Sequence, residues 1–142
     1  MLMRKLFTLI LLLVSAASVN ELFAQDINIS ADSVKGLLCR KWVFNYAIED
    51  GQKLGAMPGA PTINYDFKKD GTIVATANGK NDALPGTWKY DAAKKSLKAI
   101  VNNHLKITIT VLTQDQLTMV LDMKEVTPSD PTTTMVYKPG AN

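Results

Sequence analysis

The chain has 142 residues, of which 46% are hydrophobic and 20% charged, and its formal net charge is +3 at pH 7. The charges are nearly balanced and form no clustered Lys/Arg face, which argues against a nucleic-acid-binding protein. Cys39 is the only cysteine and His104 the only histidine, so an intramolecular disulfide and a histidine metal cluster are both excluded.

The first 24 residues have the three parts of a secretory signal peptide. Arg4 and Lys5 supply the positive start, residues 6–17 form an apolar run, and Ala24 precedes the expected cleavage point. The apolar run is too short to cross a bilayer as a helix, which needs about 20 residues. We expect cleavage after Ala24 and therefore a periplasmic or secreted protein.

The alternative is an uncleaved membrane anchor, which Asn20 and Glu21 disfavour because they interrupt the apolar stretch. A lipid anchor would need a cysteine after the cleavage point, where Gln25 stands. We expect no membrane anchor. The mature chain, residues 25–142, has 118 residues with 14 basic and 12 acidic side chains, which is enough for one domain with one core.

A short helix is expected at the start of the mature domain. Ser30 is a suitable N-cap, and Val34, Leu37 and Leu38 follow at the spacing of one helical face. Eight residues do not hold a helix without tertiary contacts. We expect this helix to pack on the rest of the domain, as a plug at one end of a barrel.

From Lys41 onward the chain alternates between apolar and polar residues in short segments separated by turn residues, the pattern of an antiparallel meander. The expected strands lie around residues 41–49, 63–67, 72–77, 86–90, 97–101, 105–111, 117–121 and 133–137. Asp70-Gly71 marks the firmest hairpin turn. The sequence predicts an all-β fold, an eight-stranded antiparallel up-and-down barrel of the lipocalin-like kind.

Alternation in the first strand places Trp42, Phe44, Tyr46 and Ile48 on one strongly aromatic face. Trp42 begins the strand beneath the expected helix, so we expect a buried core anchor there. The Gly- and Pro-rich segment 51–61 that follows is expected to be a loop.

Connection lengths distinguish the two ends of the expected barrel. In a meander, alternate connections lie at the same end, and the long connections 51–61, 78–85 and 123–131 all belong to one end, together with the short turn 102–104. The other end has tight turns throughout. Because function concentrates on long loops carried by a rigid scaffold, the loop-rich end is the expected mouth.

Several segments of the chain together carry a family resemblance: the apolar residues before Trp42, Tyr65-Asp66-Phe67 with Asp70-Gly71-Thr72, Gly86-Thr87-Trp88, Leu97, and Leu112-Thr113 with Asp115-Gln116-Leu117. In this order they resemble the small exported lipocalin-like domains common in Bacteroidota, from about Leu37 to Tyr137. The resemblance implies a barrel, while many members of such families have no assigned ligand. Lipocalins have a Gly two residues before the first-strand Trp and an Arg on the last strand; this chain has Arg40 and Lys138 there.

The residue types needed for catalysis are scarce. We expect Cys39 to be a small buried hydrophobic residue near the tightly turned end and His104 to be a solvated turn residue at the opposite end. Four aspartates sit at strand ends or turns, where their side chains satisfy local backbone donors: Asp50, Asp70, Asp91 and Asp115. We therefore expect no enzyme, no cofactor and no metal site.

An eight-stranded barrel is just wide enough to be filled by its own side chains or to hold one small ligand. Ala75, Ala77 and Ala99 would leave room toward the loop-rich end. The candidate site for a small apolar ligand consists of six residues expected around that mouth: Tyr46, Ile48, Met57, Ala77, Leu84 and Met123. The alternative is a non-enzymatic structural or protein-interaction domain, with a self-filled barrel that presents its long loops to a protein partner.

Overall fold

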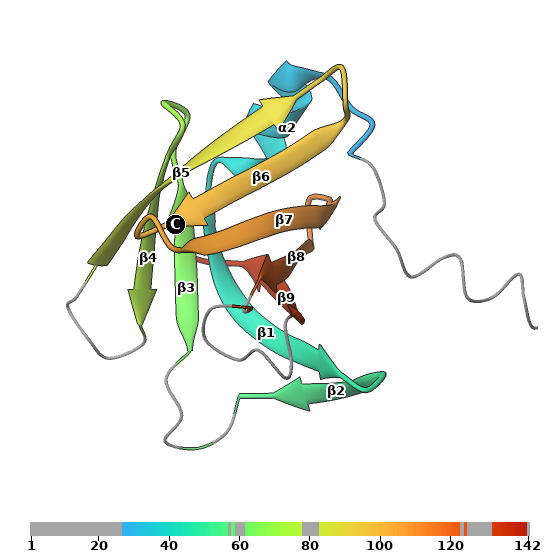
Figure 1. The fold of residues 1–142 in the computed structure, drawn as a ribbon, viewed down its shortest axis with the longest axis vertical. Coiled ribbons are helices and arrows are strands. Elements are labelled where there is room, and N and C mark those ends of the chain that lie inside the picture. Colours follow the sequence, from blue (N-terminus) through green and yellow to red (C-terminus); the bar gives the residue numbers. More distant parts are fainter. Residues whose placement is uncertain are drawn as a thin grey trace, which may run out of the picture.

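The structure is a computed structural model, and it describes residues 27–56, 58, 62–77, 83–122, 124 and 132–141. This described part has one helix and nine strands, whose arrangement Figure 1 shows. In chain order they are α2 (Ala31–Leu38), β1 (Lys41–Glu49), β2 (Gln52–Gly55), β3 (Ile63–Phe67), β4 (Thr72–Ala77), β5 (Ala83–Asp91), β6 (Ser96–Val101), β7 (Leu105–Leu112), β8 (Leu117–Asp122) and β9 (Thr132–Pro139).

The strands form one antiparallel sheet that closes into a barrel. From β3 to β9 each strand pairs with its neighbours in the sequence, and β9 returns to pair with β1 over Trp42 to Ile48. Strand β1 also pairs with β3, so β1 and β3 to β9 make a closed ring of eight strands. This confirms the predicted eight-stranded up-and-down barrel with a short N-terminal helix.

Strand β2 is an addition to the ring, and it corrects the prediction that residues 51–61 are only a loop. Asp50 and Gly51 both have positive φ, 49° and 75°, and they join Glu49 to Gln52 as a tight two-residue hairpin turn. Asp-Gly is the sequence that favours such a turn, because both residues tolerate left-handed backbone. The Gly and Pro residues farther along obscured this signal.

The pairing of β1 with β3 is short, because the two strands diverge near the middle of β1. Only Lys41 and Trp42 pair with β3, and from Tyr46 onward the same edge of β1 pairs with β2 instead. Where the strands separate, the Phe44 backbone N–H donates to the side-chain oxygen Oδ1 of Asn64 at 3.0 Å. The β1–β2 hairpin, at the bottom of Figure 1, extends beyond the ring at the loop-rich end.

A β-bulge at Asn45 reverses the faces of β1. Phe44 lies opposite Tyr137, but Tyr46 lies opposite Val136, so Asn45 is an extra residue on this strand. Directly opposed residues of antiparallel strands lie on the same face of the sheet. Phe44 therefore faces inward with Tyr137, whereas Tyr46 faces outward with Val136.

Beyond the bulge Ala47, and not Tyr46, continues the inward face, because Ala47 lies opposite Met135. Ile48 faces outward with Tyr46. The prediction that both side chains share the face of Trp42 is thus wrong, because uninterrupted alternation carries no information about an inserted residue.

The interior toward the tightly turned end is filled by the protein's own side chains. The large side chains that are fully buried there include Trp42, Tyr65, Phe67, Ile73, Leu97, Ile109, Leu117, Met119 and Tyr137. Helix α2, in blue at the top of Figure 1, packs over this end and buries Val34 and Leu38 completely. The burial of Trp42 and the position of the helix agree with the sequence-based expectations.

Backbone and side-chain hydrogen bonds fasten the N-terminal segment to this end. Ser30 Oγ accepts from the Ser33 backbone N–H at 3.1 Å, which caps the first turn of α2. The Ile27 N–H donates to the Lys95 carbonyl at 3.0 Å, and the Tyr90 hydroxyl donates to the Ile27 carbonyl at 2.7 Å. The tightly turned end is therefore closed by the segment that precedes β1.

Candidate functional site

Three large hydrophobic side chains stand out in the described part of the chain because they are exposed. Leu54, Ile63 and Leu84 have exposed fractions of 43%, 39% and 40%. They come from three different strands, β2, β3 and β5. Single exposed hydrophobic residues are common on protein surfaces, so their significance depends on where they lie.

Strand register places all three on the inner face of the barrel. Each lies directly opposite an inward-facing alanine: Leu54 opposite Ala47, Ile63 opposite Ala77, and Leu84 opposite Ala75. All three also lie toward the loop-rich end. Their exposure therefore marks a place where the inner surface of the barrel is open to solvent, and not three isolated outer positions.

Strands β8 and β9 continue this inner surface. Leu121 is buried and lies two residues from Met119 on the inner face of β8, while Met135 of β9 is partly buried against the core. We call the following six residues the apolar mouth: Leu54, Ile63, Ala77, Leu84, Leu121 and Met135. They come from six different strands.

The structure brings together only part of the sequence-predicted site. Ala77 and Leu84 belong to the apolar mouth. Tyr46 and Ile48 lie on the outer face of β1 because of the bulge, and the Lys53 ammonium stands 4.7 Å from the centre of the Tyr46 ring there. Their assignment as inward-facing lining residues is corrected accordingly.

The remaining two predicted residues, Met57 and Met123, lie outside the residues that the structure describes. The mouth also contains residues that sequence reasoning missed. Ile63 could have been included, since it alternates with the buried Tyr65. Leu54 could be found only by recognising the β1–β2 hairpin from Asp50-Gly51.

Charge is nearly absent from the inner surface. In the strands that the structure describes, register places a single charged residue, Glu49, on the inward-facing side, and it lies exposed at the tip of the β1–β2 hairpin. Lysines of the sheet alternate outward, as Lys106 does opposite Asp122. The mouth therefore presents hydrocarbon to whatever enters it.

Two buried tyrosines lie directly below the apolar mouth. Tyr65 and Tyr137 are 2% and 1% exposed, and their ring centres are 5.3 Å apart with the planes inclined at 74°. The Tyr137 hydroxyl reaches toward the mouth, where its oxygen lies 4.0 Å from Sδ of Met135. These two residues form the floor of the mouth.

Burial affects the ionisation of both floor residues. Removal from water raises the pKa of Tyr65 to about 12. The neighbouring Tyr137 hydroxyl lowers this pKa and so offsets part of the rise. Burial, and then the neighbouring Tyr65, raise the pKa of Tyr137 above its usual range. Both hydroxyl groups are consequently neutral at physiological pH, and each can donate and accept a hydrogen bond.

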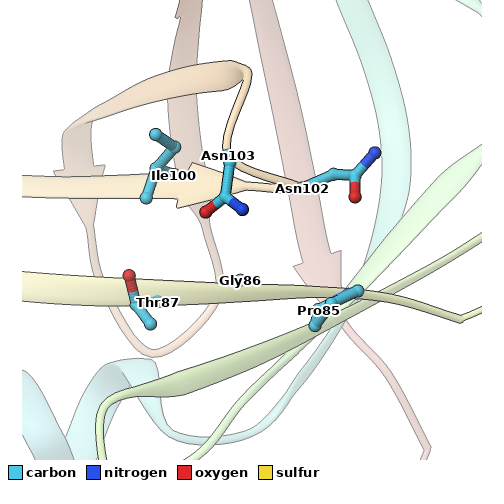
Figure 2. A pocket seen from close by; sticks show the side chains of 6 residues that line it. All are labelled: Pro85, Gly86, Thr87, Ile100, Asn102 and Asn103. Carbon is cyan, nitrogen blue, oxygen red and sulfur yellow. The ribbon is translucent and has the colours of Figure 1, made fainter.

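A second depression lies on the outer face between β5 and β6, and Figure 2 shows its lining. Its volume is about 160 Å³, and the six lining residues are Pro85, Gly86, Thr87, Ile100, Asn102 and Asn103. Asn102 and Asn103 have φ of 53° and 59°, and the Asn102 N–H donates to the Pro85 carbonyl at 2.8 Å. The shape of the depression follows from this turn, and its lining contains no ionisable side chain.

Residues considered for catalysis lie apart from one another. Cys39 is half-buried at the end of α2, and burial raises the pKa of its thiol. His104 is exposed in the β6–β7 turn at the opposite end. Asp70 Oδ1 accepts from the N–H and the hydroxyl of Thr72, which is the structural role expected for a turn aspartate and lowers the pKa of its carboxyl.

We also looked for a metal-ligand cluster, a membrane-spanning helix and similar known proteins. No group of three or more His, Cys, Asp or Glu residues within the described ranges could hold a metal ion. The helix in that same part of the chain falls short of the length and apolarity needed to cross a bilayer. No protein-family model, curated protein or solved structure matches the chain.

Proposed function

We propose that this protein is an exported, non-enzymatic, lipocalin-like binding domain that holds a small apolar ligand at the apolar mouth. One observation carries the proposal: the three exposed large hydrophobic residues of the described chain all lie on the inner face at one end of the barrel. Apolar side chains that point into a barrel and yet meet water are suited to a guest molecule.

The energetics favour a ligand that is mostly hydrocarbon. Covering apolar surface contributes about 25 cal/mol for each Å² removed from water, and the exposed mouth residues offer such surface without charged neighbours on their own face. The packed side chains of the tightly turned end hold the mouth in a fixed shape. Trp42, Phe67 and Leu97 are fully buried there, so the mouth stands on a packed base and little ordering is needed when a ligand enters.

Export is part of the proposal and rests on the N-terminal sequence. The basic start, the short apolar run and the small residue at Ala24 are typical of a cleaved signal peptide. Gln25 at the new N-terminus leaves no lipidation site there. A periplasmic or secreted location fits a carrier or sensor of apolar molecules, which are poorly soluble in water and benefit from a binding protein.

A second candidate is a structural or protein-interaction domain with a self-filled barrel. The packed tightly turned end favours it, and so does the exposure of every residue of β2. Strand β2 pairs with β1 on one side and leaves its other edge without a described partner strand. An exposed strand edge can accept a strand from another chain. The two candidates differ in whether the interior of the mouth takes up a small molecule.

A thermal-shift screen of lipids, sterols and hydrophobic pigments tests the proposal. We expect at least one compound to raise the melting temperature, with a stabilisation of about 2.7 kcal/mol at a concentration one hundred times its Kd. Ala77→Trp should abolish this shift because the indole would occupy the mouth. The matched control is Thr76→Trp, which places the same side chain one position earlier, on the outer face of β4.

The two variants separate occupancy of the mouth from a general effect of an added tryptophan. The binding proposal requires that Thr76→Trp retains the shift while Ala77→Trp, still folded, loses it. No shift with any compound, or equal shifts in both variants, would contradict binding at the mouth and favour the interaction domain.

A further inference from the structure

The floor of the apolar mouth is polar, which an apolar ligand alone does not explain. Tyr65 follows Ile63 by two residues on the inner face of β3, and Tyr137 follows Met135 by two residues on the inner face of β9. Both floor residues thus lie one step deeper than mouth residues of the same strands. Ala75, a small residue, lies directly opposite Tyr65.

The floor hydroxyls have hydrogen-bonding capacity that the protein does not use. The Tyr137 hydroxyl donates to Sδ of Met135 at 4.0 Å, and sulfur is a weak acceptor. The Tyr65 ring lies beside it, with the two ring centres 5.3 Å apart, and a bond between the two hydroxyl groups would use only one of their two protons. At least one proton therefore has no oxygen acceptor among the described residues.

A ligand oxygen would be a stronger hydrogen-bond acceptor for the floor hydroxyls than the Met135 sulfur. The floor hydroxyls are neutral, since burial raises the pKa of Tyr65 to about 12. No Lys, Arg or His faces inward in the described strands, so a buried carboxylate would have no counter-charge.

We propose that the apolar mouth takes an amphiphile whose head is a neutral oxygen group, a hydroxyl or a carbonyl, held against Tyr65 and Tyr137 while its hydrocarbon part contacts the mouth. This inference rests on the proposed function and adds the chemical class of the ligand. Hydroxyl and carbonyl heads both accept the unused proton. A free carboxylate or an ammonium is disfavoured because a charge would be buried without a partner.

The experiment separates the hydrocarbon part from the head group. Diphenylhexatriene, a fluorescent hydrocarbon without polar atoms, reports occupation of the mouth by its increase in fluorescence. Dodecanol, methyl dodecanoate, dodecanoate and dodecylamine then compete with it below their micelle-forming concentrations, so that only the head group varies. We expect dodecanol and the ester to compete at roughly five- to tenfold lower concentration than dodecanoate or dodecylamine, the effect of one hydrogen bond.

Removal of the floor hydroxyls should abolish the discrimination between heads. In the double variant Tyr65→Phe/Tyr137→Phe, the neutral and charged competitors should become equal to within about twofold, while diphenylhexatriene binds as in the wild type. Tyr90→Phe is the matched control, because the Tyr90 hydroxyl lies at the opposite end, 2.7 Å from both the Ile27 and the Ile29 carbonyl oxygen, and donates its single proton there. It should retain the wild-type preference. Near-UV circular dichroism verifies folding, and the single variants replace the double one if it unfolds.

The outcomes distinguish the two proposals. If the wild type does not bind diphenylhexatriene, the apolar site itself is wrong and this inference falls with it. If the hydrocarbon binds but neutral and charged heads compete equally, the apolar site stands and the role of the floor is refuted. If the variants without floor hydroxyls still prefer neutral over charged heads, the role of the floor is refuted as well.

Discussion

The Trp42 side chain connects helix α2 to the barrel. Its ring is fully buried, and its Nε1–H donates to the Leu38 carbonyl at the end of α2, at 3.0 Å. The Arg40 guanidinium carbon lies 5.5 Å from the ring centre, and Arg40 Nη1 donates to the Gln114 carbonyl at 3.3 Å. A cation from the segment before β1 therefore lies over the ring.

Replacement of Trp42 by Ala should lower the free energy of unfolding by about 3 to 5 kcal/mol, because it leaves a large cavity and removes the bond to the helix. Urea unfolding measures the change. Trp88→Ala is the control: Trp88 is only half-buried, although its Nε1–H also donates to a carbonyl, that of Lys68 at 2.8 Å. We expect Trp88→Ala to lower the free energy of unfolding by less than Trp42→Ala does. Equal losses would mean that burial of the Trp42 ring is not what stabilises the tight end.

At the level of elements, close approach of neighbouring strands constrains the sequence. Gly86 occupies an inward position of β5 opposite Val101. A Cβ at this position would lie 2.6 Å from the Ile100 carbonyl oxygen and 3.1 Å from Val101 Cα. Both obstacles are backbone atoms of β6, so they cannot move aside as a flexible side chain would.

Gly86→Ala should therefore destabilise the domain by about 1 to 3 kcal/mol, since β5 and β6 must separate to admit the methyl group. Gly36→Ala is the matched control. Gly36 lies in α2, where an added methyl group would meet nothing within 4 Å, and alanine favours a helix by about 0.5 to 1 kcal/mol over glycine. Thermal unfolding should show a lower melting temperature for the first variant and an unchanged or higher one for the second. A Gly86→Ala protein as stable as the wild type would contradict the strand-contact argument.

On the scale of the whole molecule, the barrel has one filled end and one end that is partly open. Side chains and α2 fill the tightly turned end, while at the loop-rich end Val101, Ile107 and Leu121 are buried and Leu54, Ile63 and Leu84 are exposed on the inner surface. The tyrosine floor lies between the two ends. The proposed binding site and the packed base thus lie at different ends of one scaffold, so we expect the base to remain folded when residues of the mouth are substituted.

The buried floor also makes global stability depend on pH at the alkaline side. The pKa of Tyr65 is about 12 in the folded protein and about 10 in an unfolded chain, so between these values the unfolded state has lost a proton that the folded state keeps. Stability from this group is fully present below pH 10 and declines as pH rises toward 12. The expected loss is of the order of 2 to 3 kcal/mol.

Urea unfolding at several pH values between 9 and about 12 measures this dependence. Tyr65→Phe should show a flatter decline over this range, because it removes one group with different pKa values in the two states. Tyr46→Phe is a suitable control, since this side chain lies on the outer face of β1. A decline of equal steepness in all three proteins would contradict the role of Tyr65.

Local sequence patterns predicted much of this fold. Alternation in segments such as Leu105–Leu112, together with the Asp70-Gly71 turn, identified the barrel strands and their order, because a period of two and a tight turn are properties of the nearby chain. The plug helix followed from Ser30 and the spacing of Val34 and Leu38. Connection lengths indicated the loop-rich end, and alternation placed Ala77 on the inner face there, whereas Leu84, expected in the connection 78–85, lies in strand β5.

The rest of the site depended on long-range pairing. Whether Tyr46 faces in or out is decided by the bulge at Asn45, which exists only in the register of β1 against β9. Leu54 reaches the mouth because β1 leaves β3 and pairs with β2, and Tyr65 meets Tyr137 because β3 and β9 flank the two sides of β1. Contacts between residues about seventy positions apart are set by how the barrel closes, and local periodicity carries no record of that closure.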